Sequence, residues 1–165
     1  MKLGHLLLGG ILIIVLAAMP ASAFTAKTLT VTLSGNGDAQ VEMQYDLSFV
    51  EQAAIFFHAA NPAATLQNAL SENLGLPVTV VSADMSSAEV IIPSFASVTQ
   101  SGGSATMTTP AFSFANAQQD VRNEWYGFLI SADFTPQTTT ITFPDGYQAG
   151  FNNQISIPSV SHTLA

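Results

Sequence analysis

The sequence predicts an α+β domain in which about three amphipathic helices pack on one face of a mostly antiparallel sheet. Segments in which apolar and polar residues alternate lie toward both ends of the chain, and segments with helical spacing lie between them. Strands and helices do not alternate regularly, as they would around a parallel sheet. We therefore expect helices on the apolar face and a Thr-, Gln- and Asn-rich face that is exposed or available to a partner.

The first 23 residues are predicted to be a secretory signal peptide. Lys2 and His5 precede an apolar run of about 13 residues, 6–18, which is shorter than the ~20 residues that span a bilayer. Ala21-Ser22-Ala23 supplies the small residues of a cleavage site, so we expect cleavage before Phe24. A single α+β domain, 24–165, then remains, secreted or at the cell surface. The alternative is that the leader is not cleaved and anchors the protein in a membrane. Only in that case is the membrane an expected partner.

Charge and cysteine content exclude several function classes. The chain has 3 basic and 11 acidic residues and a net charge of -8, and beyond the leader only Lys27 and Arg122 are basic. Nucleic acid is a poor partner because phosphate binding requires clustered basic side chains. The absence of cysteine excludes disulfides and thiolate metal sites. We expect no nucleotide and no cofactor, since a P-loop lysine is lacking and Gly35-x-Gly37 precedes a strand.

The mature chain begins with a predicted antiparallel hairpin. Leu29, Val31 and Leu33 alternate with threonines, and residues 39–47 alternate in the same way. The intervening residues 34–38 include two glycines and an asparagine, which accept the positive φ of tight turns. Each strand therefore has one apolar face and one polar face.

Three helices are predicted from apolar residues at helical spacing. The first covers 49–60 with Ser48 as N-cap, and the second begins at Asn61-Pro62 and ends at Gly75. The third begins near Ser113 and continues to Trp125, which is interpreted as a core residue or, alternatively, a binding platform.

Further strands are predicted between and after these helices. Residues 78–81 and 90–92 form a second hairpin, and 97–109 is interpreted as an exposed loop running into a short strand near Met107. Segments 138–143 and 147–157 form a third hairpin, joined by the turn Pro144-Asp145-Gly146.

Three motifs carry a resemblance to a known group of proteins: Gly35-Asn36-Gly37-Asp38-Ala39, Phe143-Pro144-Asp145-Gly146-Tyr147 and Ile157-Pro158-Ser159-Val160-Ser161-His162. In these motifs the chain resembles uncharacterised small secreted proteins of methanogenic archaea, and the resemblance spans the mature domain. It implies secretion, and it implies no activity and no site residues.

Candidate metal ligands are few. His58 is interpreted as a surface residue, and a zinc site would need His58, His162 and a carboxylate to converge. Turn and loop positions hold Asn36, Asp38, Asp84, Asp133 and Asp145. We interpret these side chains as hydrogen-bonding to turn backbone, with calcium coordination as the alternative. No metal site is predicted.

We expect a non-catalytic exported protein of the cell envelope or extracellular matrix with a structural or recognition role. No Gly-x-Ser-x-Gly elbow or other catalytic motif is present. The alternative is a small secreted hydrolase or carbohydrate-binding domain that uses acids near Trp125 and Tyr126, with Glu124 as the neighbouring acid. A cleft with two acids and aromatic walls would favour the alternative, and an open exposed sheet would favour the first function.

Self-association through sheet edges is a further expectation. Thr28–Leu33 and Thr138–Phe143 contain no charge and no proline, which are the usual features that protect an exposed edge. The protein itself or other envelope components are therefore the expected partners. The alternative is that both strands lie inside the sheet.

Overall fold

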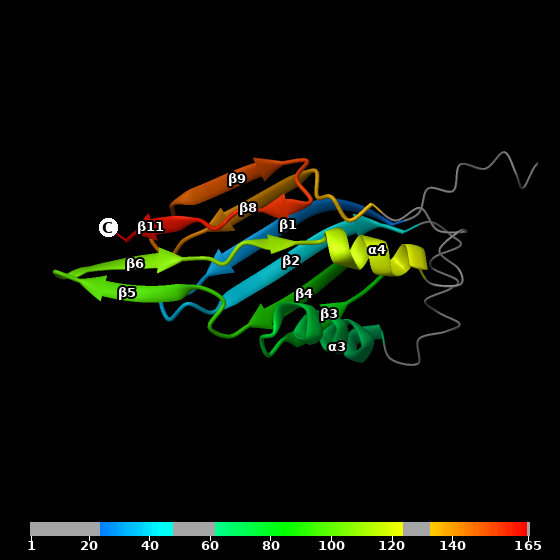
Figure 1. Ribbon diagram of the computed structural model, residues 1–165, viewed down its shortest axis with the longest axis horizontal. Coiled ribbons are helices and arrows are strands. Elements are labelled where there is room, and N and C mark those ends of the chain that lie inside the picture. Colours follow the sequence, from blue (N-terminus) through cyan, green and yellow to red (C-terminus); the bar gives the residue numbers. More distant parts are fainter. Residues whose placement is uncertain (1–23, 48–61, 124–132, 165) are drawn as a thin grey trace, which may run out of the picture.

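The structure is a computed structural model that describes residues 24–47, 62–123 and 133–164. Within these residues the chain forms eleven strands and two helices (Figure 1). Most of the strands belong to two sheets, one of six strands and one of three. The described part of the protein is therefore mostly β.

The six-stranded sheet has the order β3-β4-β2-β1-β8-β9. Its strands are β1 (Thr25–Leu33), β2 (Ala39–Asp46), β3 (Thr79–Ala83), β4 (Ser87–Ile92), β8 (Thr138–Thr142) and β9 (Gln148–Asn152). All neighbouring strands are antiparallel except β1 and β8, which are parallel. The three predicted hairpins are confirmed as β1–β2, β3–β4 and β8–β9, but the strand predicted at 147–157 ends at Asn152, and residues 156–157 pair elsewhere.

Two smaller sheets form from strands that lie outside the large sheet. One sheet has the order β11-β6-β5, with β5 (Ser97–Ser101), β6 (Ser104–Thr108) and β11 (Ser161–Thr163). The other pairs β7 (Phe112–Ser113) with β10 (Ser156–Ile157). The short strand predicted near Met107 is confirmed as β6, but the preceding loop is wrong: it forms β5, and the turn of the resulting hairpin is made by Gly102 and Gly103, both at positive φ.

The hydrophobic core lies between the six-stranded sheet and these smaller strands. Leu29, Val31 and Ile141 come from the large sheet, and Met107 and Ile157 come from β6 and β10. All five side chains are at most 2% exposed and belong to one buried cluster. Strands and loops therefore cover the apolar face of the sheet.

The predicted α+β class with three helices on one face is wrong. The described residues contain only α3 (Pro62–Leu74) and α4 (Ala115–Asn123), and α3 packs beside the edge strand β3. The physical reason is that Thr-rich segments have high β propensity and bury Met107, so the covering layer forms from strands. No helix within the described ranges is long and apolar enough to cross a membrane.

Two of the predicted helices can be compared with the structure. The second is confirmed as α3, and Gly75, at φ 63°, donates its N–H to the Ser71 carbonyl at 3.0 Å and ends it. The third begins two residues later than predicted and is described as far as Asn123. The first, at 49–60, lies outside the described residues.

Two uncharged segments were candidates for open edges of the sheet. Neither of them lies at an edge. β1 pairs with β2 on one side and with β8 on the other, and β8 also pairs with β9. The interpretation that Thr28–Leu33 and Thr138–Phe143 lie inside the sheet is therefore confirmed, and neither segment is an edge through which the protein could associate. Both are interior strands, because residues more than a hundred positions apart in the chain pair with each other.

Candidate functional surface

Six threonines form a regular array at the centre of the large sheet. Thr28, Thr30 and Thr32 of β1 lie in register beside Thr138, Thr140 and Thr142 of β8. The alternate residues on these strands are buried in the core, so the six threonines point to the opposite face. Sheet geometry spaces neighbours about 4.8 Å apart across the strands and about 6.7 Å along them.

The strands beside this array extend the same polar face. The exposed side of the sheet, which we call the outer face, adds Gln40, Glu42 and Gln44 from β2, Ser87, Glu89 and Ile91 from β4, and Gln148, Gly150 and Asn152 from β9. Only the two glutamates among these residues carry a charge. The predicted Thr-, Gln- and Asn-rich face is confirmed, and it is a broad, open surface.

The two glutamates of the outer face lie directly opposite each other on β2 and β4. Like charges in such cross-strand pairs are destabilising, but each carboxylate accepts a hydrogen bond from a glutamine. Gln40 Nε2 donates to Glu89 Oε1 at 2.7 Å, and Gln44 Nε2 donates to Glu42 Oε1 at 3.2 Å. The carboxylates retain free lone pairs that can accept hydrogen bonds from a ligand.

Asp38 hydrogen-bonds the turn of the first hairpin. Its Oδ1 accepts the Ser94 N–H at 2.8 Å, and its Oδ2 accepts the Asn36 amide at 2.7 Å. Asn36 Oδ1 in turn accepts the Asp38 N–H at 3.2 Å. The interpretation of these side chains as turn-bonding groups is therefore confirmed, and the Asp38 carboxylate also ties the β1–β2 turn to the chain after β4.

Asp84 caps the β3–β4 turn. Its Oδ1 accepts the Ser86 and Ser87 N–H groups at 2.7 and 2.8 Å. These backbone hydrogen bonds, followed by those from the two serine hydroxyls, lower the pKa of Asp84 below 3.8. The Tyr45 hydroxyl donates to the Asp84 or Ser87 carbonyl, and burial followed by the charge of Asp84 raises the pKa of Tyr45. The Asp84 carboxylate and the Tyr45 hydroxyl thus both form hydrogen bonds with the backbone of this turn.

Replacing Asp84 with asparagine is expected to lower the melting temperature at pH 7, because an uncharged amide accepts these hydrogen bonds less strongly. A depressed carboxyl pKa stabilises the folded state above the unfolded pKa, and this contribution is lost as the pH falls through the folded pKa. The difference in melting temperature between wild type and D84N should therefore be largest above the unfolded pKa of about 4 and should decrease as the pH falls through the lower folded pKa. Thermal unfolding across this range measures it, and a pH-independent difference would contradict the assignment.

The remaining candidate aspartates also bond to turn backbone. Asp133 Oδ1 accepts the Thr135 N–H at 2.9 Å, and Asp145 Oδ1 accepts the Tyr147 N–H at 3.1 Å. Among the described residues, no three histidine or acidic side chains come together in a way that could hold a metal ion. Asp133 and Asp145 therefore act as turn caps.

His162 lies in a small aromatic cluster that sequence reasoning did not find. Its ring stacks on Tyr147 with centroids 4.1 Å apart and planes 11° apart, and it meets Phe143 edge-on at 5.1 Å. Its Nε2 lies 2.7 Å from Asp145 Oδ2. No local signal predicts this cluster, because β11 reaches the β8–β9 turn only through its pairing with β6. These contacts fasten β11 to the turn.

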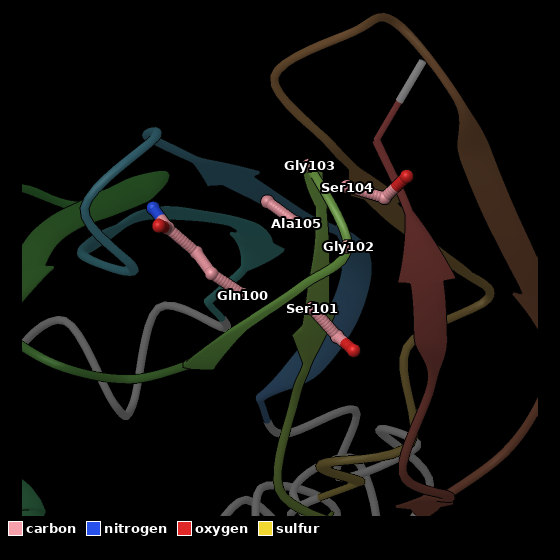
Figure 2. A pocket seen from close by; sticks show the side chains of 6 residues that line it. All are labelled: Gln100, Ser101, Gly102, Gly103, Ser104 and Ala105. Carbon is pink, nitrogen blue, oxygen red and sulfur yellow. The ribbon is translucent and has the colours of Figure 1, made fainter.

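The predicted binding residues Glu124, Trp125 and Tyr126 lie outside the described residues, and so does His58. A shallow hollow does occur at the turn of the β5–β6 hairpin, lined by Gln100, Ser101, Gly102, Gly103, Ser104 and Ala105. Figure 2 shows Gln100 and Ala105 on one side of the hairpin and Ser101 and Ser104 on the other. The lining holds no acid and no aromatic ring, so it is not the cleft that a glycoside hydrolase requires.

Comparisons with family models, with characterised proteins and with solved structures find no match to this chain.

Proposed function

We propose that the chain is an exported, non-catalytic protein of the cell envelope or extracellular matrix, and that its outer face binds a neutral, hydroxyl-rich polymer such as an envelope polysaccharide. The observation that carries this proposal is the in-register array of six threonines flanked by glutamine and asparagine side chains. The predicted leader peptide supports export.

The chemistry of the outer face suits such a polymer. Threonine hydroxyls and glutamine amides both donate and accept hydrogen bonds, as sugar hydroxyls do. Lys27, a basic residue at the end of this face, is paired with Asp46 at 2.9 Å, and Glu42 and Glu89 add acceptors for ligand hydroxyls. An open sheet offers many weak contacts to an extended chain, and repeated contacts raise the overall affinity.

The same geometry favours binding over catalysis. Glu42 and Glu89 are adjacent carboxylates, but they lie on an open surface and each is engaged by a glutamine amide. Glycoside hydrolysis needs two carboxyl groups on either side of a bound sugar, within a site that excludes water. Carboxylates that project from the same open face can contact a sugar hydroxyl but do not enclose a glycosidic bond.

Lysine at Thr30 or at Thr140 is expected to weaken polymer binding about tenfold, which corresponds to 1.4 kcal/mol. The two residues are register partners at the centre of the array, and a lysine there covers neighbouring hydroxyls without emptying the core. Cosedimentation with protein-free envelope polysaccharide measures the bound fraction.

Ser104→Lys is the matched control, because it adds the same charge to an exposed residue of the smaller sheet. It should bind as wild type does. The proposal fails if the wild-type protein stays in the supernatant, or if all three lysine variants bind equally.

A further inference from the structure

Asn36, in the β1–β2 turn, is the only asparagine in the chain that is followed by glycine. In such a pair the backbone nitrogen of the glycine can attack the side-chain amide, because glycine has no Cβ to hinder the approach. A five-membered imide forms when Gly37 N bonds to Asn36 Cγ and the Cγ–Nδ2 bond breaks. The amide nitrogen leaves as ammonia, taking the proton of the Gly37 N–H. Water then adds to the imide, opens one of its two C–N bonds and leaves aspartate or isoaspartate at position 36.

The fold holds the attacking nitrogen away from this reaction. The Gly37 N–H donates to the Ser34 carbonyl at 2.9 Å, and Gly37 itself has φ 90°. This is a three-residue loop in which a type I turn is followed by a glycine in the left-handed region. Asn36 occupies the third position of the type I turn, where ψ is about 0°. The imide requires a rotation about this bond that brings Gly37 N beside Asn36 Cβ, and the rotation breaks the hydrogen bond to Ser34.

A contact with a distant segment fixes Gly37 from its other side. The Gly37 carbonyl accepts the Ala96 N–H at 2.8 Å. A Cβ on Gly37 would lie 2.3 Å from the Ala96 carbonyl oxygen, so the two backbones are in close contact. This contact lies where the chain leads from β4 into β5 (Figure 1). Rotation at Gly37 therefore requires the turn to separate from residues 94–96.

The amide that would be attacked is held as well. Asn36 Oδ1 accepts the Ser34 hydroxyl at 2.6 Å and the Asp38 N–H at 3.2 Å. Asn36 Nδ2 donates to Asp38 Oδ2 at 2.7 Å, and Asp38 Oδ1 accepts the Ser94 N–H at 2.8 Å. The negative charge of Asp38 beside the amide also disfavours the anionic intermediate through which the imide forms. The turn thus restrains both reacting groups.

We propose that Asn36 is a deamidation site that the folded turn protects, and that its modification loosens the turn from residues 94–96. The reaction proceeds only from molecules in which the turn has opened, so its rate follows the population of that open state. After deamidation, position 36 no longer donates a hydrogen bond to Asp38 and instead places a second negative charge beside it. The two carboxylates repel each other, which weakens the hydrogen bond between Asp38 and Ser94. The reaction consumes only water, so it needs no enzyme outside the cell.

Deamidation of Asn36 is expected to be at least about tenfold slower in the native protein than in the same protein unfolded in urea at the same pH. The full chain is incubated at mildly alkaline pH, and mass spectrometry of proteolytic peptides measures asparagine, aspartate and isoaspartate at position 36. The ratio of the rate in urea to the native rate is the protection factor. Equal rates in the two conditions would overturn the proposal.

Ser34→Ala and Asp38→Ala each remove hydrogen bonds to the Asn36 amide and are expected to lower the protection factor about threefold or more. Each variant's own rate in urea is its control, because it includes any effect of the substitution on the chemistry itself. Circular dichroism checks that the variants are folded. Folded variants with the wild-type protection factor would contradict the role assigned to the turn.

Asn36→Asp reproduces the charge of the product and is expected to lower the melting temperature, because it places a carboxylate beside Asp38. Asn152→Asp is the matched control, since it adds the same charge to an exposed residue of β9. It should melt as wild type does. If N36D melts as wild type does, or if both variants lose the same stability, modification at Asn36 does not loosen the turn.

Discussion

Replacing Met107 with alanine is expected to destabilise the protein by about 2–5 kcal/mol. Met107 lies on β6, is 0% exposed and belongs to the buried cluster formed with Leu29, Val31 and Ile141 of the large sheet. Its truncation would leave a cavity between the two layers. For a domain of this size, a loss of 3 kcal/mol lowers the melting temperature by roughly 6–12 °C. Chemical denaturation gives the free energy of unfolding directly.

Val98→Ala is the matched control for this prediction. Val98 is the register partner of Met107 on β5, but it is 37% exposed. Replacing Val98 with alanine loses less buried apolar surface than replacing Met107 does. The loss of stability should therefore be less than about 1 kcal/mol. If M107A were as mild as V98A, the smaller sheet would not be the layer that covers the core.

Replacing Gly37 with alanine is expected to destabilise the protein by about 2–4 kcal/mol. Gly37 has φ 90°, a conformation that costs a residue with a side chain about 1–3 kcal/mol. A Cβ at this position would lie 2.3 Å from the Ala96 carbonyl oxygen, so the backbone would have to separate. That movement also weakens the hydrogen bond from the Ala96 N–H to the Gly37 carbonyl, worth about 1 kcal/mol.

Gly35→Ala tests the same turn without this constraint. Gly35 does not have a positive φ, and a Cβ there would meet nothing within 4 Å. Its replacement should leave stability unchanged or raise it by up to about 1 kcal/mol, because alanine restricts the unfolded chain. Urea denaturation of both variants decides the matter, and equal losses for G35A and G37A would mean that the contact with Ala96 is unimportant.

Local patterns predicted the hairpins and α3 because their partners are close in sequence. The alternation in β1 and β2, with the turn at 34–38, specifies both the pairing and the buried face. Asn61-Pro62 and Gly75 mark the ends of α3 by the conformations those residues favour. Asn36 and Asp84 were correctly interpreted as turn-bonding residues, because their backbone partners lie within the same turns. The backbone partner of the Asp38 carboxylate is Ser94, which is distant in the sequence.

The fold class was wrong because the sequence does not show which segments cover the sheet. Residues 97–109 are polar and of low complexity, yet they form β5 and β6 and bury Met107. Serine and threonine are common both in exposed loops and in strands with one solvent-exposed face. Which of the two forms depends on the layer that packs against the segment. The candidate residues Glu124, Trp125 and Tyr126 lie outside the described part of the chain.

For the strands that alternation predicted, such as β1 and β2, the sequence by itself determined which residues face the core and which face outward, because side chains alternate along a strand whatever its neighbours are. Only the tertiary structure decided that β1 and β8 are parallel neighbours inside the sheet and that β5 is an edge. Pairing between Thr30 and Thr140 depends on bringing together segments about a hundred residues apart, and no local propensity encodes such a contact. The threonine array of the outer face therefore exists only in the folded chain.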